Sequence, residues 1–200
     1  MTSVVSICNQ ALGRLRAKQI AALTDDTVEA NACTTYYETS RDLVLADFPW
    51  NFANKAIAIA QLSETPIEWG FAYTYPTGAL TINKLMASSN LRHYTDPTEW
   101  EIGLLSDDTK AIFTNLDVAY AKFTAKVTNV NQFTPHFVTA LGWYLASEIA
   151  IPVAGVAKGR VLADRAVQGY VNSLRAAYST NANEGDEGPP RDPETIRAHQ

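Results

Sequence analysis

The sequence predicts an α+β fold, in which a bundle of about four helices is interrupted by a small antiparallel β insertion. Before residue 48 and again after residue 134, apolar residues recur every three to four positions, which is typical of amphipathic helices. Between them, short runs rich in aromatic and β-branched residues alternate with turn residues, which is typical of strands. We therefore expect an N-terminal helical part over 1–54, a β insertion over 55–130, the C-terminal helical part of the same bundle over 131–180, and a flexible tail over 181–200.

Composition bounds the class of protein. The chain has 200 residues, of which 46% are hydrophobic and only 18% charged, so it can bury a core, and part of its sparsely charged surface is expected to be covered by a partner. The net charge of −5 argues against a protein that coats nucleic acid. No apolar run approaches the ~20 residues of a membrane span. Cys8 and Cys33 are expected to be buried and reduced.

The first two helices are predicted over residues 3–18 and from about residue 27 to the Phe48–Pro49 break. Thr2 or Ser3 is expected to cap the first helix. Asp26 followed by Glu29 resembles a capping box at the start of the second, which ends at Pro49 because proline cannot continue a helix. The predicted buried stripe of the first helix is Val4, Cys8, Leu12 and Leu15, and that of the second is Val28, Ala32, Tyr36, Leu43 and Asp47, with Cys33, Tyr37 and Val44 beside it.

The third and fourth helices follow the β insertion. Thr134 and Pro135 combine a capping hydroxyl with a proline at the first helical position, so a helix is predicted to begin there and to end at Pro152. The last helix is predicted over residues 156–180. The expected buried face of the third helix is Val138, Leu141, Leu145 and Ile149, and that of the fourth is Ala163, Val167, Tyr170, Leu174 and Tyr178.

Seven short strands are predicted in the β insertion, over residues 56–60, 69–75, 79–85, 91–94, 100–105, 111–115 and 119–125. The polar residues 106–110 separate two of these runs and predict a hairpin.

Aromatic residues concentrate at the start of the β insertion and form two candidate groups. The first is a structural hinge, made by Phe48, Pro49, Trp50, Asn51 and Phe52, in which we expect Trp50 and Phe52 to be buried between the helices and the sheet. The second is a candidate interface on one strand. Its members, which belong either to the core or to a subunit contact, are Trp69, Phe71, Tyr73 and Tyr75.

No pattern in the sequence is typical of an active site, so we expect no catalytic residue, no cofactor and no metal. His93, His136 and His199 are scattered, and their spacing from the cysteines does not suggest a metal site. Pairs of acidic residues occur at Glu64/Glu68, Glu99/Glu101 and Asp107/Asp108. Solvated surface charge is the simplest interpretation of these pairs, and a glycosidase-like pair is the alternative.

The C-terminal residues 179–200 contain five acids, two arginines and one large aliphatic residue. This composition predicts a segment that is disordered in the isolated chain. Ile196 and Arg197 offer one hydrophobic anchor and one charge, so they are candidate interface residues that order on assembly.

A set of residues in the first part of the chain resembles one protein family. The run Ser6-Ile7-Cys8-Asn9-Gln10-Ala11-Leu12 is followed by Ile20, Leu23, Ala30, Cys33, Tyr37, Arg41-Asp42, Leu45 and Phe48-Pro49-Trp50-Asn51-Phe52-Ala53, then by Trp69, Tyr73, Tyr75 and Pro76. This pattern resembles the head-to-tail adaptors of short-tailed bacteriophages, the group called tail tubular protein A or head-completion protein. The resemblance covers about the first 76 residues.

The resemblance implies a structural virion protein without catalysis. Such adaptors form a ring of twelve copies below the portal protein, extend the DNA channel, and offer a docking site for tail nozzle or tail fibre proteins. Genome DNA would pass through without sequence-specific binding, which an acidic lumen favours because it repels phosphate. The expected location is the tail or neck of the virion, with the host cytoplasm during assembly, and no membrane.

Two alternatives stay open. One is a tail-associated cell-wall hydrolase, which would need an exposed groove with two carboxylates about 5–10 Å apart. The other is a cellular α+β protein that shares the hinge motif.

Overall fold

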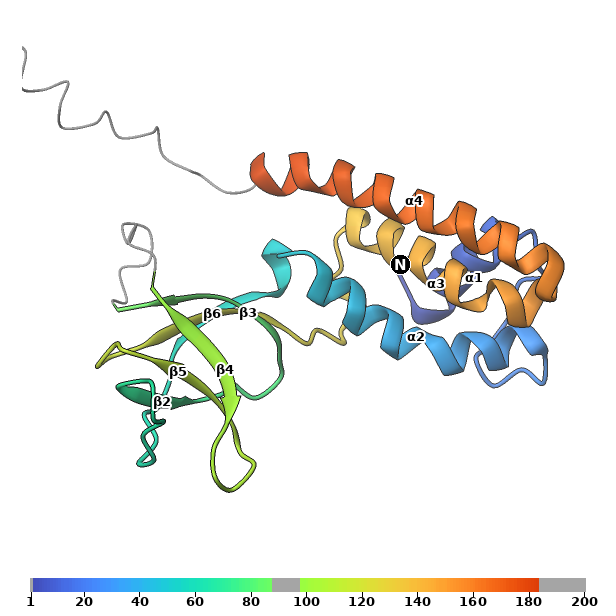
Figure 1. Cartoon of the computed structure of the whole chain (residues 1–200). Helices are drawn as coiled ribbons and strands as arrows, with labels where there is room; N and C mark the ends of the chain where they lie inside the picture. Colours follow the sequence, from blue (N-terminus) through green and yellow to red (C-terminus); the bar gives the residue numbers. More distant parts are fainter. Residues whose placement is uncertain (1, 88–97, 184–200) are drawn as a thin grey trace, which may run out of the picture.

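The α+β class is confirmed. The computed structural model describes residues 2–87 and 98–183, and within them four helices and two three-stranded antiparallel sheets form. Figure 1 shows the helices packed together in one part of the molecule and the sheets in another. The predicted strand 91–94, and Ile196 and Arg197 of the predicted tail, lie outside the described residues.

Helix α1 (Val4–Arg14) begins where predicted because Ser3 caps it. The Ser3 hydroxyl accepts a hydrogen bond from the Ser6 N–H at 3.1 Å, and the Ser6 hydroxyl accepts one from the Ser3 N–H at 2.9 Å. This reciprocal pair is a capping box. The helix ends before the predicted residue 18, since Arg16 has a positive φ of 56°, a backbone conformation that right-handed helices do not contain.

Helix α2 (Val28–Asp47) has a different cap and a different buried face from those predicted. Thr27, not Asp26, caps it and accepts a hydrogen bond from the Ala30 N–H. Val28 and Leu43, predicted to be buried, are 60% and 42% exposed. The buried face is instead centred on the residues predicted to lie beside the stripe. Its side chains include Cys33, Tyr37, Val44 and Leu45.

Helix α3 (Pro135–Ala154) is the central helix of the bundle and packs against α1, α2 and α4. Thr134 caps it as predicted, and the predicted face, Val138, Leu141, Leu145 and Ile149, is buried. By length and composition α3 could cross a membrane, which no run was expected to do; half of its apolar window is buried inside the fold.

Pro152 does not end helix α3, contrary to the prediction. The proline removes one backbone donor in the last turn, and the helix continues to Ala154. It stops at Gly155, whose φ of 75° is available to glycine at little cost.

Helix α4 (Val156–Asn183) extends three residues beyond the predicted end at residue 180. It is also rotated about its axis relative to the predicted buried face. Tyr170 is buried as expected, but Val167 and Tyr178 are 45% and 71% exposed. The face turned to the bundle is instead built on small residues, which let two helices approach closely. These small residues are Gly159, Ala166, Gly169 and Ala177.

The β part lies between α2 and α3 and contains two sheets, where one small sheet was expected. The first has the order β1-β6-β3, and the second β2-β5-β4. The bounds are β1 (Asn54–Ala58), β2 (Phe71–Thr74), β3 (Ala79–Met86), β4 (Trp100–Leu104), β5 (Lys110–Thr114) and β6 (Tyr120–Ala125). The hairpin between β4 and β5 forms as predicted. The strand predicted over 56–60 lies two residues earlier, at 54–58 (β1). The strand predicted over 69–75 is shorter and covers 71–74 (β2).

The helical part and the β part have separate apolar cores. Ile82, Ile112 and Phe123, from both sheets, share one core, so the sheets pack face to face. The helical core is separate and includes the side chains before and after the β part, such as Trp50 and Phe133. A salt bridge of 2.8 Å between Asp42 on α2 and Lys126 after β6 joins the two parts.

Candidate functional site: two grooves and an exposed helix face

The predicted hinge is a turn whose aromatic side chains belong to the helical core. Phe48 and Trp50 are buried and Phe52 is half-buried, while Pro49 and Asn51 lie at the surface. The Trp50 ring lies 4.7 Å from the Phe48 ring, centroid to centroid. The turn continues as a short 3-10 helix, Asn51–Ala53, directly into β1.

Trp50 is held from two sides. Its indole N–H donates a hydrogen bond of 2.8 Å to the carbonyl of Val44. The edge of its ring meets Phe137 of α3 at 5.2 Å between centroids, and Phe52 meets Phe137 at the same distance. These rings were expected between the helices and the sheet. They lie instead against α3, as part of the helical core.

The four aromatic residues of the candidate interface are divided by the structure. Tyr73 is buried in the core of the two sheets, and its hydroxyl donates a hydrogen bond of 2.7 Å to the Leu116 carbonyl. Phe71 is half-buried beside it. Tyr75 lies under Lys110, whose Nζ is 3.7 Å from the ring centroid. Trp69 lines an open groove and is therefore the member with an open surface beside it.

That groove, here called the edge groove, lies beside the outer strand of the second sheet and has a volume of about 510 Å³. The β4–β5 hairpin and the loop before β2 form its walls. It is lined by Glu64, Thr65, Pro66, Ile67, Glu68, Trp69, Glu101, Leu104, Leu105, Ser106 and Phe113. Three of these residues are acidic and none is basic.

Two of the three carboxylates are held in place. Glu64 accepts hydrogen bonds from the Ser106 N–H at 2.9 Å and from the Ser106 hydroxyl at 2.8 Å. Glu101 accepts one from the Trp69 indole N–H at 3.3 Å. Beyond the groove, hydrogen bonds from Thr109 in the hairpin turn hold the pKa of Asp107 below its ordinary value. The surface around the hairpin is therefore acidic and fixed.

The edge groove contains what a cation or a basic side chain would contact: carboxylates, an aromatic ring and apolar side chains. Among residues 2–87 and 98–183, no group of three or more histidine, cysteine or acidic side chains is placed to hold a metal ion. The groove therefore suits an organic cation on a larger ligand better than a bound metal.

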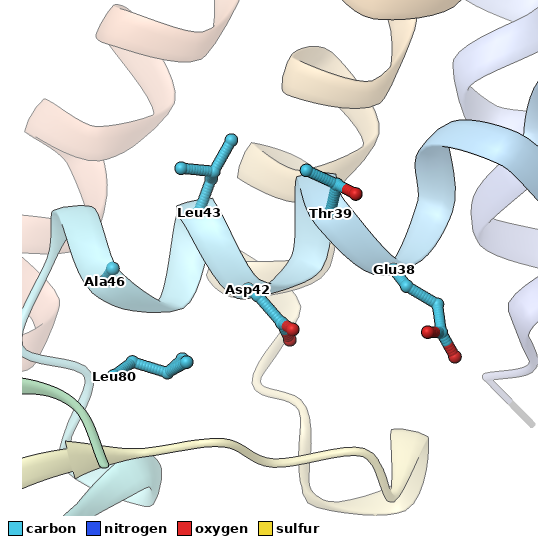
Figure 2. A pocket seen from close by; sticks show the side chains of 6 residues that line it. All are labelled: Glu38, Thr39, Asp42, Leu43, Ala46 and Leu80. Carbon is cyan, nitrogen blue, oxygen red and sulfur yellow. The ribbon is translucent and has the colours of Figure 1, made fainter. Parts of the chain in front are cut away.

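A second hollow, the junction groove, lies between α2 and the first sheet and has a volume of about 380 Å³. Its lining residues are Glu38, Thr39, Asp42, Leu43, Ala46 and Leu80. Figure 2 shows the carboxylates of Glu38 and Asp42 on the side of α2 that faces the sheet. Asp42 forms salt bridges there with Arg41 and Lys126, each 2.8 Å away, so its charge is compensated and the bridge to Lys126 joins the two parts.

A third surface is the outer face of α4, where exposed apolar side chains lie among charged and polar ones such as Arg160 and Asp164. Val167 and Tyr178 were predicted to be buried on this side. The exposed side chains of this α4 outer face are Val156, Val161, Val167, Val171 and Tyr178.

The α4 helix itself is firmly attached to the bundle. Tyr170 donates a hydrogen bond of 2.8 Å to Asp47 at the end of α2. Burial and this hydrogen bond raise the pKa of Tyr170 above its ordinary value. The Trp143 ring of α3 packs closely against Gly169 of α4, and Arg14 of α1, whose pKa burial lowers to about 10, lies 4.2 Å over that ring. The outer face of α4 is therefore presented on a fixed helix.

Sequence patterns alone did not identify the edge groove. Its walls come from residues 64–69 and 101–113, and their contact depends on the pairing of β2 and β4 on either side of β5. One local signal was present. Ile67 stands between Glu64 and Glu68 in a polar loop, and it is fully exposed in the fold.

Comparison of the chain with models of known families returned no match, and comparison with curated proteins returned none either. The geometry above and the resemblance in residues 6–76 are therefore the grounds for inferring a function.

Proposed function

We propose that this protein is a structural virion component, a head-to-tail adaptor that joins the portal protein of a short-tailed bacteriophage to its tail. In this role the chain forms a ring below the portal, extends the DNA channel and receives a tail protein. It acts by assembly and has no catalytic step.

The observation that carries the proposal is the presence of exposed apolar side chains on both parts of the molecule. The α4 outer face belongs to the helical part, whereas Ile102 and Leu104, 39% and 62% exposed, belong to the β part. A subunit that closes a ring uses two different surfaces, because its side-to-side contacts are heterologous. Apolar side chains on separate surfaces are what such contacts need.

The residues that carry the resemblance also support the proposal, because several of them make contacts that hold this fold together. Asn9 exchanges two hydrogen bonds of 2.9 Å with the backbone of Ile20, which fixes the loop after α1. Phe48 and Trp50 build the turn into the β part. A shared pattern at such positions is expected of a shared fold.

The charge of the chain is compatible with a DNA conduit. A net charge of −5 repels the phosphate backbone, so DNA would slide through a ring of such subunits without adhering to it.

A cell-wall hydrolase is the second candidate, because the edge groove brings Glu64, Glu101 and Trp69 together. Both oxygens of Glu64 already accept hydrogen bonds from Ser106, an arrangement that suits a structural role better than proton transfer. Clearing of a peptidoglycan suspension that is lost in Glu101→Gln would favour the hydrolase. Portal and capsid genes beside the gene for this chain would separate both candidates from a cellular protein that shares the hinge motif.

Sedimentation velocity with and without portal rings tests the adaptor function. The chain alone is expected to be mainly monomeric at about micromolar concentration and to sediment with portal rings when they are added. Val167→Asp on the α4 outer face is expected to weaken this attachment, whereas Gln168→Asp, exposed on the next position of the same helix, is the matched control. A chain that never sediments with portal rings would contradict the proposal.

A further inference from the structure

Among the residues that the structure describes, strand β4 leaves one side of the second sheet open. The order β2-β5-β4 places β4 and β2 at opposite edges. The β2 edge is covered, since Leu62 donates a hydrogen bond to the Ala72 carbonyl and Thr74 donates one to the Ala60 carbonyl. Across the described ranges 2–87 and 98–183, no backbone hydrogen bond links the outer side of β4 to another segment.

The register shows which backbone groups of β4 are free. Leu105 donates a hydrogen bond to the Thr109 carbonyl at 3.0 Å, which makes that pair a hydrogen-bonded one. Hydrogen-bonded and non-hydrogen-bonded pairs alternate in an antiparallel ladder. Residues 103 and 101 therefore bond to β5, and the N–H and C=O groups of residues 100, 102 and 104 point away from the sheet.

The edge lacks lysine, proline and bulges, three of the devices that commonly protect an open strand, and carries one charge, Glu101. Edge strands are usually blunted by lysine, proline or bulges. The sequence of β4 is WEIGL, without lysine or proline, and its pairing with β5 runs over five residues without a register shift. By contrast, the pairing of β3 with β6 in the first sheet has two shifts.

Side chains on the two faces of β4 would meet different partner side chains. Glu101 and Leu105 face the edge groove, which holds three carboxylates and the Trp69 ring and has no basic lining residue. Ile102 alternates with them on the other face and is partly exposed; Leu104 is exposed at the end of the strand, where it also lines the edge groove. Successive side chains of a strand point to opposite faces, so a strand laid beside β4 would present every second side chain to the acidic groove.

We propose that the open edge of β4 and the edge groove form a docking site for an extended segment of another protein, in which lysine or arginine alternates with apolar residues. The segment adds to the sheet as a strand, its basic side chains lie over Trp69 and the carboxylates, and its apolar side chains cover Ile102 and Leu104. Charge complementarity selects a basic occupant. The inference does not depend on the adaptor function, since it rests on the edge and the groove alone.

Binding of synthetic peptides, measured by fluorescence anisotropy, tests this docking site. A labelled seven-residue peptide of alternating valine and lysine is expected to bind, and a valine–glutamate peptide of the same length is not. A valine–lysine peptide with N-methylated backbone amides on the side that pairs should bind at least about tenfold more weakly, because it cannot complete the ladder. Equal binding of the methylated and unmethylated peptides would overturn strand addition.

Variants of the chain locate the site. Ile102→Pro removes an N–H that points away from β5, a position at which an edge strand tolerates proline, and is expected to weaken peptide binding at least about tenfold. Glu68→Gln combined with Glu101→Gln should weaken it severalfold, most at low salt, whereas Asp164→Asn on α4 should not. Unchanged peptide binding by the folded glutamine pair would overturn the charge argument.

Hydrogen exchange and the oligomeric state of the chain also test this docking site. Slowed hydrogen exchange at the Ile102 and Leu104 amides of the unaltered chain on peptide addition would support it without any variant, and unchanged exchange at saturating peptide would overturn it. A dimer of this chain that dissociates on Ile102→Pro would assign the edge to a second copy and would also overturn it.

Discussion

At the scale of single residues, Trp50 connects the end of α2 to the bundle and to the start of the β part. Its N–H bonds to Val44 on α2, and its ring packs on Phe137 of α3. Only 2% of the residue is exposed. The chain enters β1 within four residues of Trp50, so the same side chain that fills the helical core also fixes where the sheet begins.

Trp50→Ala is therefore expected to lower the free energy of unfolding by about 3–5 kcal/mol, the range for removing a large buried aromatic side chain. Trp50→Phe should cost less, because it keeps a ring and loses the hydrogen bond to Val44. Denaturant unfolding of both variants measures the difference. If Trp50→Ala kept its melting temperature but failed to assemble, the tryptophan would belong to an interface instead.

The buried tyrosines predict how stability depends on alkaline pH. Burial and the bond to Asp47 raise the pKa of Tyr170 above its ordinary value of 10, and burial raises the pKa of Tyr37 to about 12. Above pH 10 the unfolded chain loses these protons while the folded chain keeps them. Stability from these groups is thus complete below pH 10 and is lost as pH rises toward the folded pKa values.

Unfolding measured from about pH 8 to pH 11 should show this decline, and Tyr170→Phe should make it shallower. Tyr178→Phe is the matched control, because Tyr178 lies on the same helix and is 71% exposed. Equal slopes in the Tyr170→Phe and Tyr178→Phe variants would contradict the assignment of the effect to Tyr170.

At the scale of elements, the existence of the helices was predictable and their exact rotation was not. Apolar periodicity located all four helices, and capping residues located the starts of α1 and α3. The buried face of α4 was predicted from its large apolar residues. The rotation differs because the close approach of α3 and α4 depends on small residues instead. A Cβ added at Gly159 would lie 2.7 Å from the Ala150 carbonyl oxygen and from the Ile151 Cα. Val167, which the pattern of large residues placed on the buried side, is 45% exposed.

The same reasoning explains what was missed in the candidate site. The hinge aromatics were predictable because they are adjacent in the chain. The edge groove was not, because Trp69 and Glu101 meet only through the pairing of β2 with β5, two strands that are not consecutive in sequence. Local patterns carry no information on that pairing.

Gly159→Ala is expected to destabilise the fold by about 1–3 kcal/mol, since the new methyl group meets backbone that must move. Gly13→Ala is the matched change at an open position, because a Cβ there has no atom within 4 Å. It should stabilise the chain by about 0.4–1 kcal/mol through the unfolded state. Thermal unfolding distinguishes the two, and a neutral Gly159→Ala would refute the close packing of α3 on α4.

At the scale of the whole molecule, the described fold ends with α4 at Asn183, and the candidate anchor residues Ile196 and Arg197 lie beyond it. A chain that ends at Asn183 keeps every described contact, so its melting temperature should equal that of the full chain. It should attach to portal rings more weakly if the anchor acts on assembly. Attachment as strong as that of the full chain would remove the anchor hypothesis.

We propose that this chain assembles on a portal through its exposed apolar surfaces. Electron microscopy of portal rings, imaged with and without the purified chain, tests it most directly. We predict a second ring of density below the portal only when the chain is present, and weaker or absent density with Val167→Asp. Bare portal rings in an excess of the unaltered, folded chain would contradict the claim.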